Sequence, residues 1–334
     1  MKHYLIPASG HFYKANLHTH TTCSDGCKTP EEIKEIYKAH GYSVIAYTDH
    51  DIMIDHSDLN DEDFLAITSH EVETNGPAMF GDFGESPCYH LNFYSPIPDQ
   101  TDYACPNPGY AWGNARAIAD TQPHYKGDYQ RIYSVEGQND MIAKARAKGY
   151  LVSYNHPNWS MNTYETYSKL ENLNMLEINN GASNRGSDMD YTPYVYDQML
   201  RLGKRISCVG GDDNHDRIHF FKAWTMVKAE TLTHENILNS IEAGDCYASS
   251  GPEISELYYE DGKVYIKCSE ADAIHLYTAG RRRARTAEVK EGEFVTEASF
   301  EILPTDHYFR IAVKDKKGNH ANTNAIFMDT LLQE

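Results

Sequence analysis

The stretch Asn16-Leu-His-Thr-His-Thr-Thr-Cys-Ser-Asp-Gly26 places two histidines, His18 and His20, one residue apart. In an extended strand, side chains at positions i and i+2 point to the same face, so both imidazoles can converge on one cation. A carboxylate, Asp25, follows in a Ser-Asp-Gly turn. A His-x-His pair alone is weak evidence for a metal site. Further apolar runs along the chain also end in His, Asp or Glu, and this recurrence strengthens the metal interpretation.

The composition indicates a well-packed globular protein rather than a disordered one, with 40% hydrophobic and 12% aromatic residues among 334. A chain of this length accommodates one large domain and one small domain. The formal net charge of −19 argues against a broad basic face for long nucleic acids. Small phosphorylated substrates remain open, because bound divalent cations reverse the local potential.

Membrane and secretion signals are missing from the sequence. No apolar run approaches the roughly 20 residues of a membrane span, and the segment Met-Lys-His-Tyr-Leu-Ile-Pro lacks the apolar core of a secretory signal. The seven cysteines are scattered and contain no Cys-x-x-Cys pair. We therefore expect reduced thiols in a cytoplasmic protein without membrane partners.

A strand–helix–strand unit follows the opening stretch. Thr29-Pro-Glu-Glu32 has the residues of a helix start, with Thr at the N-cap, Pro in the first turn and Glu at the capping-box position. Gly41 ends this helix, and the apolar run 43–48 has strand length and leads into Asp49-His50-Asp51. Two strands joined by a helix are expected to be parallel.

The same alternation continues to about residue 250. Strands are predicted at 13–20, 43–48, 64–68, 87–93, 150–154, 175–180, 205–209 and 223–228, and helices at 30–40, 137–148, 192–203 and 233–243. The segment 95–134 is rich in Pro, Gly, Asn and Tyr without a clear period, which is typical of a lid or an excursion. Beyond residue 250, apolar and polar residues alternate with a period of two, which is typical of β-strands, and turns are predicted at 260–263 and 317–319.

These patterns predict an α/β fold. We expect an irregular (β/α) barrel of about seven strands over residues 1–250 and a small C-terminal β-sandwich domain over 251–334. Polar residues gathered at the C-terminal ends of strands are typical of barrel active sites. A doubly wound sheet also places ligands at strand ends, but it explains less well why so many separate strands contribute.

The candidate metal ligands lie at or just beyond the predicted strands and carry nitrogen or oxygen donors. They are His18, His20, Asp25, His50, Glu71, His90, His156, Asp213 and His215. Six histidines and three carboxylates without a thiolate suit catalytic Zn²⁺, Mn²⁺ or Fe²⁺ better than Mg²⁺ or a structural zinc. Nine ligands exceed what one tetrahedral ion needs, so two or three divalent ions are expected, with a carboxylate bridging at least two of them.

Each ligand assignment competes with a purely structural interpretation. A single histidine at a strand end is often a hydrogen-bonded turn residue. Asp25 is also a good turn former, and Asp213 is also a good helix cap. Glu73 lies one strand repeat beyond Glu71 on the same face, and Asp212 precedes Asp213, so each is an alternative to its neighbour.

The motifs resemble those of the PHP family, named for polymerase and histidinol phosphatase, whose members are metal-dependent phosphoesterases. They occur in family order as Asn16-Leu-His-Thr-His with Ser24-Asp-Gly, Thr48-Asp-His-Asp51, Glu71-Val, His90, Asn155-His-Pro157 and Gly211-Asp-Asp-Asn-His215. The resemblance covers roughly residues 12 to 250. The tail from 249 to 252 resembles the start of the β-rich extension of some bacterial members.

The resemblance implies a distorted seven-stranded barrel with a trinuclear site. It implies three ligand groups: His18, His20, Glu71 and Asp213; Glu71, His90 and His156; and Asp25, His50 and His215. Two features depart from the family pattern. Ser69 stands where Gly is frequent two residues before the bridging glutamate, and the segment between His90 and His156 is long and aromatic.

Other residues are candidates for supporting roles. Asp49 is expected to orient ligand histidines, as an alternative to a plain turn residue. Arg185 and Arg217 are the best candidates for a phosphate clamp, as alternatives to surface ion pairs. Glu177 is interpreted either as a support for the ligands or as a carboxylate at the edge of the core. The basic run 281–285 is either a solvated hairpin or a contact for an anionic substrate.

The function expected from the resemblance is hydrolysis of a small phosphomonoester or nucleotide, with water activated between two ions as the nucleophile. One alternative is a phosphodiesterase or exonuclease acting on short oligonucleotides. A second alternative, from a different class, is a carbohydrate or polymer binding module without catalysis, given the 25 tyrosines and the β-rich tail. The expected partner is a small phosphorylated substrate rather than a long nucleic acid.

Overall fold

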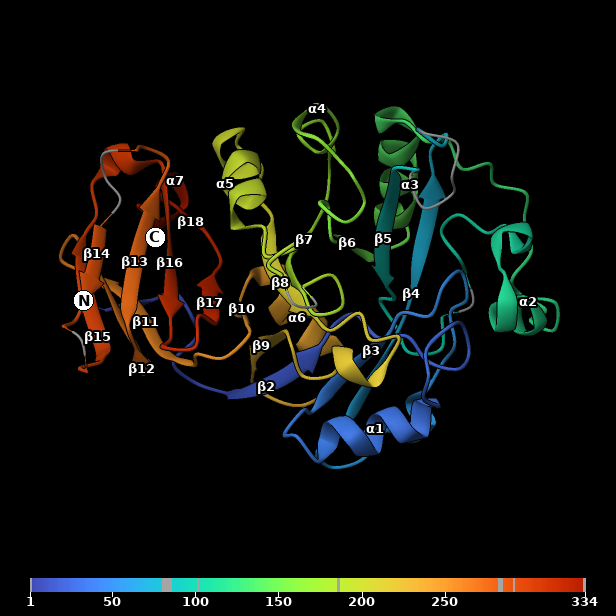
Figure 1. Ribbon diagram of the computed structural model, residues 1–334, viewed down its shortest axis with the longest axis horizontal. Helices are drawn as coiled ribbons and strands as arrows, with labels where there is room; N and C mark the ends of the chain where they lie inside the picture. The colour runs from blue at the N-terminus through green and yellow to red at the C-terminus, as the bar shows by residue number, and fades with distance from the viewer. Residues whose placement is uncertain are drawn as a thin grey trace.

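The computed structural model describes residues 2–79, 86–100, 102–184, 187–281, 285–290 and 292–332. These residues form a mixed α/β fold with seven α-helices and eighteen β-strands. The strands build one 14-stranded sheet and one separate 4-stranded sheet. Figure 1 shows the C-terminal strands, in orange and red, beside the part of the chain that carries most of the helices.

Seven strands of the large sheet carry the segment with the candidate ligands. They are β2 (His11–Asn16), β3 (Val44–Tyr47), β4 (Leu65–Asn75), β5 (Cys88–Tyr94), β6 (Leu151–Tyr154), β7 (Met175–Asn180) and β8 (Ser207–Gly211). They pair in this sequential order. The pairs β2–β3, β3–β4, β6–β7 and β7–β8 are parallel, whereas β5 is antiparallel to both of its neighbours.

A closed barrel is not established by these pairings. Among the described residues, no strand pairing joins β8 to β2, so the ladder has two ends. The ends nevertheless approach each other, because Thr19 and Asn214 form a single parallel bridge. The Asp213 backbone N–H also donates to the His18 carbonyl at 2.8 Å. The chain segments beyond β2 and β8 therefore lie side by side where ligands are predicted.

The helices that follow the strands begin and end close to where the sequence places them. The main ones are α1 (Pro30–Lys38), α3 (Val135–Ala147), α5 (Pro193–Arg201) and α6 (His234–Ala243). At the start of α1 the Thr29 side chain accepts from the Glu32 N–H, and the Glu32 side chain accepts from the Thr29 N–H. This capping box satisfies two N–H groups that a helix leaves free and fixes the first turn.

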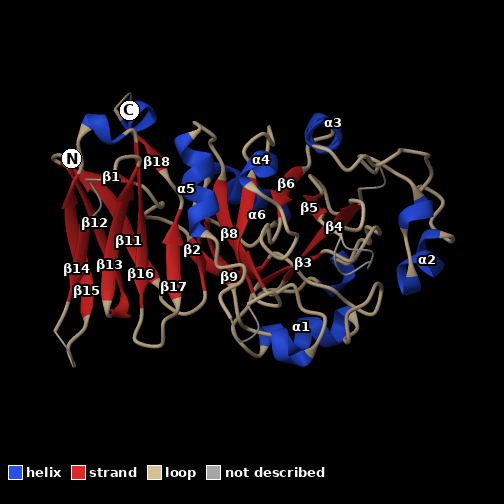
Figure 2. Cartoon of the chain, turned by 45° about the horizontal axis from the view of Figure 1, so that its top comes forward, coloured by secondary structure: helices blue, strands red, loops and turns tan. Residues whose placement is uncertain are grey.

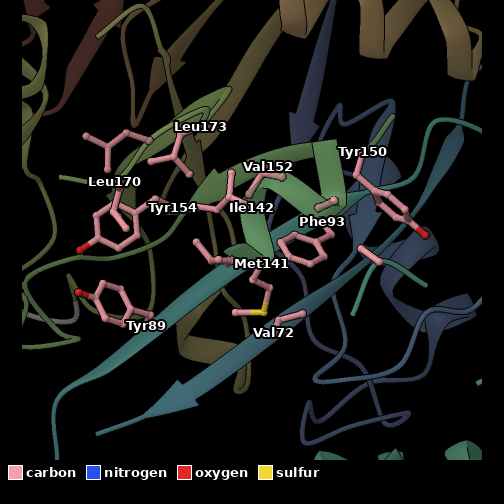
Figure 3. Packing of buried hydrophobic residues seen from close by; sticks show 14 of the residues in the cluster. Val72, Tyr89, Phe93, Met141, Ile142, Tyr150, Val152, Tyr154, Leu170 and Leu173 are labelled. Atoms are coloured by element: carbon pink, nitrogen blue, oxygen red, sulfur yellow. The ribbon is translucent and has the colours of Figure 1, made fainter. Parts of the chain in front are cut away.

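Helix α3 packs against the sheet through its apolar face. Met141 and Ile142 of α3 are fully buried in one cluster with Phe93 of β5 and Val152 of β6. Figure 3 shows these side chains interleaved between the helix and the strands. Burial of such side chains stabilises the fold by about 1.5–3 kcal/mol each and holds the strand ends that carry His90 and His156.

The segment 95–134 contains short helical elements, η3 (Pro108–Tyr110) and α2 (Gly113–Ala119), as well as irregular chain. Its buried apolar side chains, such as Ala115 and Tyr125, join the main hydrophobic cluster, and two hydrogen bonds add polar anchor points. The Tyr103 hydroxyl accepts from the Met53 N–H at 2.8 Å, and the Asn114 side chain donates to the Thr22 carbonyl at 3.1 Å. The second contact ties this excursion to the loop between His20 and Asp25.

The large sheet continues from β2 into the C-terminal part of the chain. The continuing strands are β9 (Trp224–Ala229), β10 (Cys246–Ser249), β17 (His320–Thr323), β16 (Tyr308–Lys314), β13 (Ala273–Thr278), β14 (Arg285–Glu288) and β18 (Ile326–Phe327). Antiparallel pairing of β10 with β17 crosses residue 250. The boundary at residue 250 stays a prediction, and strand pairing joins the two parts across it.

The 4-stranded sheet is formed by β1 (His3–Tyr4), β11 (Ile254–Glu260), β12 (Lys263–Ala271) and β15 (Val295–Glu301). Asp261 and Gly262 join β11 to β12 with φ values of 49° and 79°, which suit a two-residue hairpin turn. Apolar side chains of β12, β13 and β16, including Val264, Leu276 and Ile311, share one buried cluster. Figure 2 shows these strands gathered near the two chain termini, and the β-sandwich description stays a prediction.

A buried ion pair joins α5 to the C-terminal strands. The Arg310 guanidinium of β16 donates to both carboxylate oxygens of Asp197 at 2.7 and 2.8 Å. Arg310 is 2% exposed, and its guanidinium lies 4.2 Å from the Tyr277 ring centroid. No helix among the described residues is long and apolar enough to span a membrane, and the seven cysteines, all within the described part, are free thiols.

Candidate metal centre

The nine candidate ligands converge at one end of the sheet, from elements far apart in the sequence. His18 and His20 follow β2, His50 follows β3, and His156 follows β6. Glu71 and His90 lie within β4 and β5, while Asp213 and His215 follow β8. Their donor atoms fall into overlapping groups in which all atoms lie within 4.8 Å of one another. Three of the groups contain the sets implied by the family resemblance, with His20 added to Asp25, His50 and His215, and two further groups are His18, His156 and Glu177, and Cys23, Asp49 and His56.

The innermost group contains His18, His20, Glu71 and Asp213, all nine-tenths or more buried. The two Nε2 atoms are 3.2 Å apart. Asp213 Oδ1 lies 3.3 Å from the first Nε2 and 3.1 Å from the second. Four donors bound to one ion at about 2.0–2.1 Å in a tetrahedron are separated by about 3.3–3.4 Å. These separations therefore suit a shared cation. The two imidazoles converge although β2 ends before them, at Asn16.

The second group shares Glu71 with the first. Glu71 Oε1 lies 3.1 Å from His90 Nδ1 and 3.4 Å from His156 Nε2. Its other oxygen, Oε2, lies 3.3 Å from His20 Nε2 and 3.4 Å from His50 Nδ1. This carboxylate therefore stands among imidazoles on both sides, as a bridging ligand must.

The third group lies nearest to solvent. Asp25 Oδ2 is 3.3 Å from His215 Nε2 and 3.9 Å from His50 Nε2. The side chains of Asp25 and His215 are 26% and 31% exposed, whereas those of His18 and His20 are at most 1% exposed. The cluster therefore has a buried floor and an accessible rim.

The residues fit a group of divalent cations on a further observation. Within the part of the chain that the structure describes, four of their buried polar atoms have no hydrogen-bond partner: His20 Nδ1, His50 Nδ1, His90 Nε2 and Asp213 Oδ1. Each such atom costs about 1–3 kcal/mol when it is left unpaired. Several unpaired nitrogen and oxygen atoms within one buried cluster indicate that cations complete the site, and their chemistry suits Zn²⁺, Mn²⁺ or Fe²⁺.

Neighbouring polar groups fix the orientation of the ligand imidazoles. His18 Nδ1 donates to Glu177 Oε1 at 3.0 Å, so its Nε2 turns a lone pair toward the cluster. His215 Nδ1 similarly donates to the Asp213 carbonyl at 2.9 Å. His156 Nδ1 lies 3.1 Å from Ser160 Oγ, a partner that the sequence did not reveal. Both interpretations of Glu177 remained open on sequence grounds, and the structure places it against a candidate ligand.

Two ambiguous carboxylate pairs are resolved in space. Glu71 lies in the cluster, whereas Glu73 lies at the edge, 3.9 Å from His90 Nε2, and accepts from the Asn75 side chain. Asp213 lies in the cluster as well. Asp212 points away from it and accepts from the Tyr37 hydroxyl and from the backbone N–H groups of residues 221–223.

Asp49 has a different set of partners from the one expected. Its carboxylate accepts from the Thr21 N–H and hydroxyl, both at 2.8 Å, and from the Ser24 hydroxyl at 2.6 Å. Among the described residues, the hydrogen bonds of Asp49 therefore go to the loop between His20 and Asp25 rather than to a ligand histidine. It shapes the turn that carries Asp25 from one ligand group to another.

The electrostatics of the cluster favour ionised carboxylates. Burial alone would raise the pKa of Glu71, but the positive charges on the imidazoles of His18 and His90 hold it well below its usual range. Burial lowers the pKa values of His18 and His90 themselves, but the neighbouring carboxylates outweigh it and raise both well above the usual value. Burial would likewise raise the pKa of Asp213, but nearby imidazoles, His18 foremost, hold it well below its usual range. Burial lowers the pKa of His50 to about 3, so this imidazole stays neutral, the form that binds metals.

Three residues in or beside the cluster adopt left-handed backbone conformations. The φ values are 62° for Asp51, 25° for His156 and 51° for Asp213. Such conformations cost about 1–3 kcal/mol in non-glycine residues and concentrate at functional sites. Here they turn two candidate ligands inward immediately after strands β6 and β8.

A cavity of about 510 Å³ opens over the cluster. Its lining includes Asp25, Glu71, His156 and His215, together with the indoles of Trp112 and Trp159. No Lys or Arg lines it among the described residues. The exposed Arg217 lies outside this lining. Arg185 and positions 282–284 of the basic run lie outside the described residues.

Comparison with known proteins identified structural neighbours. A two-domain protein from Bacteroides vulgatus that contains a predicted PHP-like metal-dependent phosphoesterase has a TM-score of 0.46 and 16% identity, covering 89% of this chain and 88% of that one. The structural neighbours include a PHP-like protein. The lesion-specific endonuclease EndoQ from Pyrococcus furiosus has a TM-score of 0.40 and 13% identity, covering 70% of this chain and 56% of its own.

No family model and no curated protein matches the chain. With TM-scores below 0.5, none of the structural likenesses by itself assigns a function to it.

Proposed function

We propose that this chain is a metal-dependent phosphoesterase that hydrolyses a small phosphomonoester or nucleotide. The observation that carries the proposal is the convergence of six imidazoles and three carboxylates in overlapping groups, several of whose buried nitrogen and oxygen atoms have no hydrogen-bond partner among the described residues. A binding module without catalysis has no need for such a set. A structural zinc site is also a poor match, because such sites are closed and rich in thiolates, whereas the nine proposed ligands are imidazoles and carboxylates.

The proposed ligands hold two or three divalent ions. His18, His20, Glu71 and Asp213 would hold the innermost ion, and Glu71 would also serve a second ion with His90 and His156. Asp25, His50 and His215 would serve a third. Bound divalent ions supply an activated water at neutral pH and neutralise the charge of a phosphoryl group.

The protein side chains determine how the substrate approaches. Because Asp25 and His215 are the most exposed members of the cluster, the phosphoryl group enters on their side. The cavity lining offers no Lys or Arg among the described residues, so the phosphate charge must be balanced mainly by the ions. This arrangement suits one phosphoryl group better than a polyanion. Arg185 and Arg217 stay predictions as a phosphate clamp.

No protein nucleophile is required by this arrangement. Cys23, two residues before Asp25, is half-buried, and burial raises the pKa of its thiol. Ser24 donates its hydroxyl to Asp49. Glu71 and Asp213 keep their carboxylates ionised, which favours cation binding over proton transfer.

The proposal is tested by measuring phosphate release from a panel of phosphorylated metabolites and a short single-stranded oligonucleotide. The protein is reconstituted in Mn²⁺, Zn²⁺ or Fe²⁺. We expect turnover of small monoesters that is abolished in His20→Ala and His156→Ala, while circular dichroism remains unchanged. His124→Ala, at an exposed position in the excursion, is the matched control and keeps its activity.

Two results would overturn the proposal. One is phosphate release that persists in both ligand variants. The other is the absence of turnover on every compound by protein that has taken up the metal. Preferential turnover of the oligonucleotide would replace the monoesterase with the phosphodiesterase alternative.

A further inference from the structure

A second cavity, of about 450 Å³, lies beside the one over the metal ligands. It is lined by Asp51, Glu73, Thr74, Asn75, Tyr110, Trp112 and Arg131. The linings of the two cavities share Glu73 and Trp112, so they adjoin each other. A cavity of this size is within the range of small-molecule sites.

The charge in this second cavity is mostly compensated. Arg131 has a side chain only 3% exposed and is paired with the carboxylate of Asp51. It also donates to the Glu73 carbonyl at 2.7 Å, and its guanidinium lies 4.2 Å from the Tyr110 ring centroid. The carboxylate of Glu73 adds a negative charge that Arg131 does not balance. An anionic group is therefore disfavoured here, and an uncharged one is favoured.

One buried polar group of the lining residues lacks a partner. Within the described part of the chain, Arg131 Nε has no hydrogen bond, and the Arg131 side chain is only 3% exposed. Buried polar groups are normally satisfied, because each costs about 1–3 kcal/mol otherwise. A guanidinium N–H donates to an oxygen, so a hydroxyl oxygen of an uncharged ligand matches this group.

Aromatic faces border the same space. Trp112 is 47% exposed, and its ring centroid is 5.7 Å from that of His50. Trp159, which is 50% exposed, lies 5.1 Å from the His156 ring on the metal-centre cavity. Exposed indoles beside a polar cavity offer stacking surfaces for a flat or puckered ring.

We propose that the second cavity binds the alcohol portion of the substrate, and that this portion is an uncharged, hydroxyl-bearing ring. The phosphoryl group then lies over the metal ligands, and the ring lies against Trp112. Hydrolysis breaks the P–O bond to the alcohol and forms a P–O bond to the oxygen of water. The released alcohol leaves with a proton from that water. A sugar phosphate and a nucleoside monophosphate share this chemistry, and the inference rests on the proposed phosphoesterase function.

The kinetic test compares Trp112→Ala with the wild type on adenosine 5′-monophosphate, glucose 6-phosphate and acyclic glycerol 3-phosphate. We expect the kcat/KM ratio of a ring-bearing substrate to the acyclic one to fall about 10-fold, the effect of losing one stacking contact. The loss should appear mainly in KM, and Trp112→Phe should restore most of the ratio. Phe294→Ala, an exposed aromatic position in the C-terminal part, is the matched control. An unchanged ratio in Trp112→Ala overturns the inference.

A binding test separates this inference from the proposed function. Adenosine and glucose are titrated into the metal-reconstituted protein, and binding is followed by isothermal calorimetry. We expect one of the two alcohols to bind saturably and the binding to be lost in Trp112→Ala. If neither binds, the ring subsite is wrong even when phosphate release is observed. If one binds through Trp112 but no phosphate ester is hydrolysed, the proposed function fails and the ring-binding site remains.

Discussion

Replacing Glu177 with Gln tests how the protein orients its innermost ligand. Oε1 of Glu177 accepts from His18 Nδ1 at 3.0 Å. Oε2 accepts from the His156 N–H at 3.2 Å and from the Asn180 side chain at 2.9 Å. In the glutamine variant, the side-chain oxygen can still accept from the His156 N–H and from Asn180 at the position of Oε2. The NH₂ group then takes the place of Oε1 and faces His18 Nδ1. Two donors then face each other.

His18 can relieve this clash only by moving its proton to Nε2, the atom that faces the cluster. The lone pair needed for the metal is then lost. Losing one hydrogen bond to a charged acceptor costs about 1.5–3 kcal/mol, and loss of such a supporting partner weakens metal binding by about 10- to 100-fold. We therefore expect Glu177→Gln to weaken Zn²⁺ binding by 10- to 100-fold.

The assay is competition with a chromophoric chelator, which gives the dissociation constant of each ion. Glu165→Gln is the matched control, because its side chain is 84% exposed on the short helix α4 (Tyr164–Tyr167). The Tm of the metal-free variant is measured in parallel to show that the fold is retained. A dissociation constant within about twofold of the wild type would refute the proposed orientation of His18.

Three further perturbations have expected outcomes. Arg310→Met leaves Asp197 buried and unpaired and should lower the free energy of unfolding in urea by about 3–5 kcal/mol; Asp197→Leu in the same chain should recover most of it, and a loss below about 1 kcal/mol would contradict the ion-pair account. Burial lowers the pKa of His234 to about 4. As the pH drops from about 6.5 to 4, the His234 imidazole therefore takes up a proton in the unfolded chain but not in the folded one, and the free energy of unfolding falls. His234→Gln should remove up to about 3 kcal/mol of that fall, and an unchanged pH profile would speak against the buried neutral imidazole. Chelation should lower Tm, because ligand at about 100 times its dissociation constant stabilises the native state by about 2.7 kcal/mol; an equal Tm with and without metal would count against binding to the folded chain.

The sequence allowed the strand-end ligands to be predicted because each follows an apolar run of strand length. Alternation of strands and helices brings the ends of such runs together, so His50 and His156 were expected in one site, in different ligand groups, despite their separation in the chain. The structure places His50 Nδ1 and His156 Nε2 each 3.4 Å from a carboxylate oxygen of Glu71. The capping residues of α1 were equally readable, since Thr29 and Glu32 act through local hydrogen bonds.

Features that depend on long-range contacts could not be predicted in this way. The bond between His18 and Glu177 joins residues 159 positions apart, and no local pattern encodes it. Trp112 and Arg131 belong to the excursion 95–134, whose irregular sequence gives no period from which to place a side chain. Adjacent carboxylates such as Asp212 and Asp213 were ambiguous, because only the packed loop at 221–223 shows which one turns away.

The central claim is that the buried imidazole and carboxylate groups bind divalent metal ions. Elemental analysis of the protein reconstituted in Zn²⁺, Mn²⁺ or Fe²⁺ tests it most directly, with Asp25→Asn and His156→Ala measured alongside. We predict two or three ions per wild-type chain and a loss of at least one ion in each variant, with circular dichroism unchanged. A wild-type chain without bound transition metal, or variants that retain the full complement, would contradict the claim.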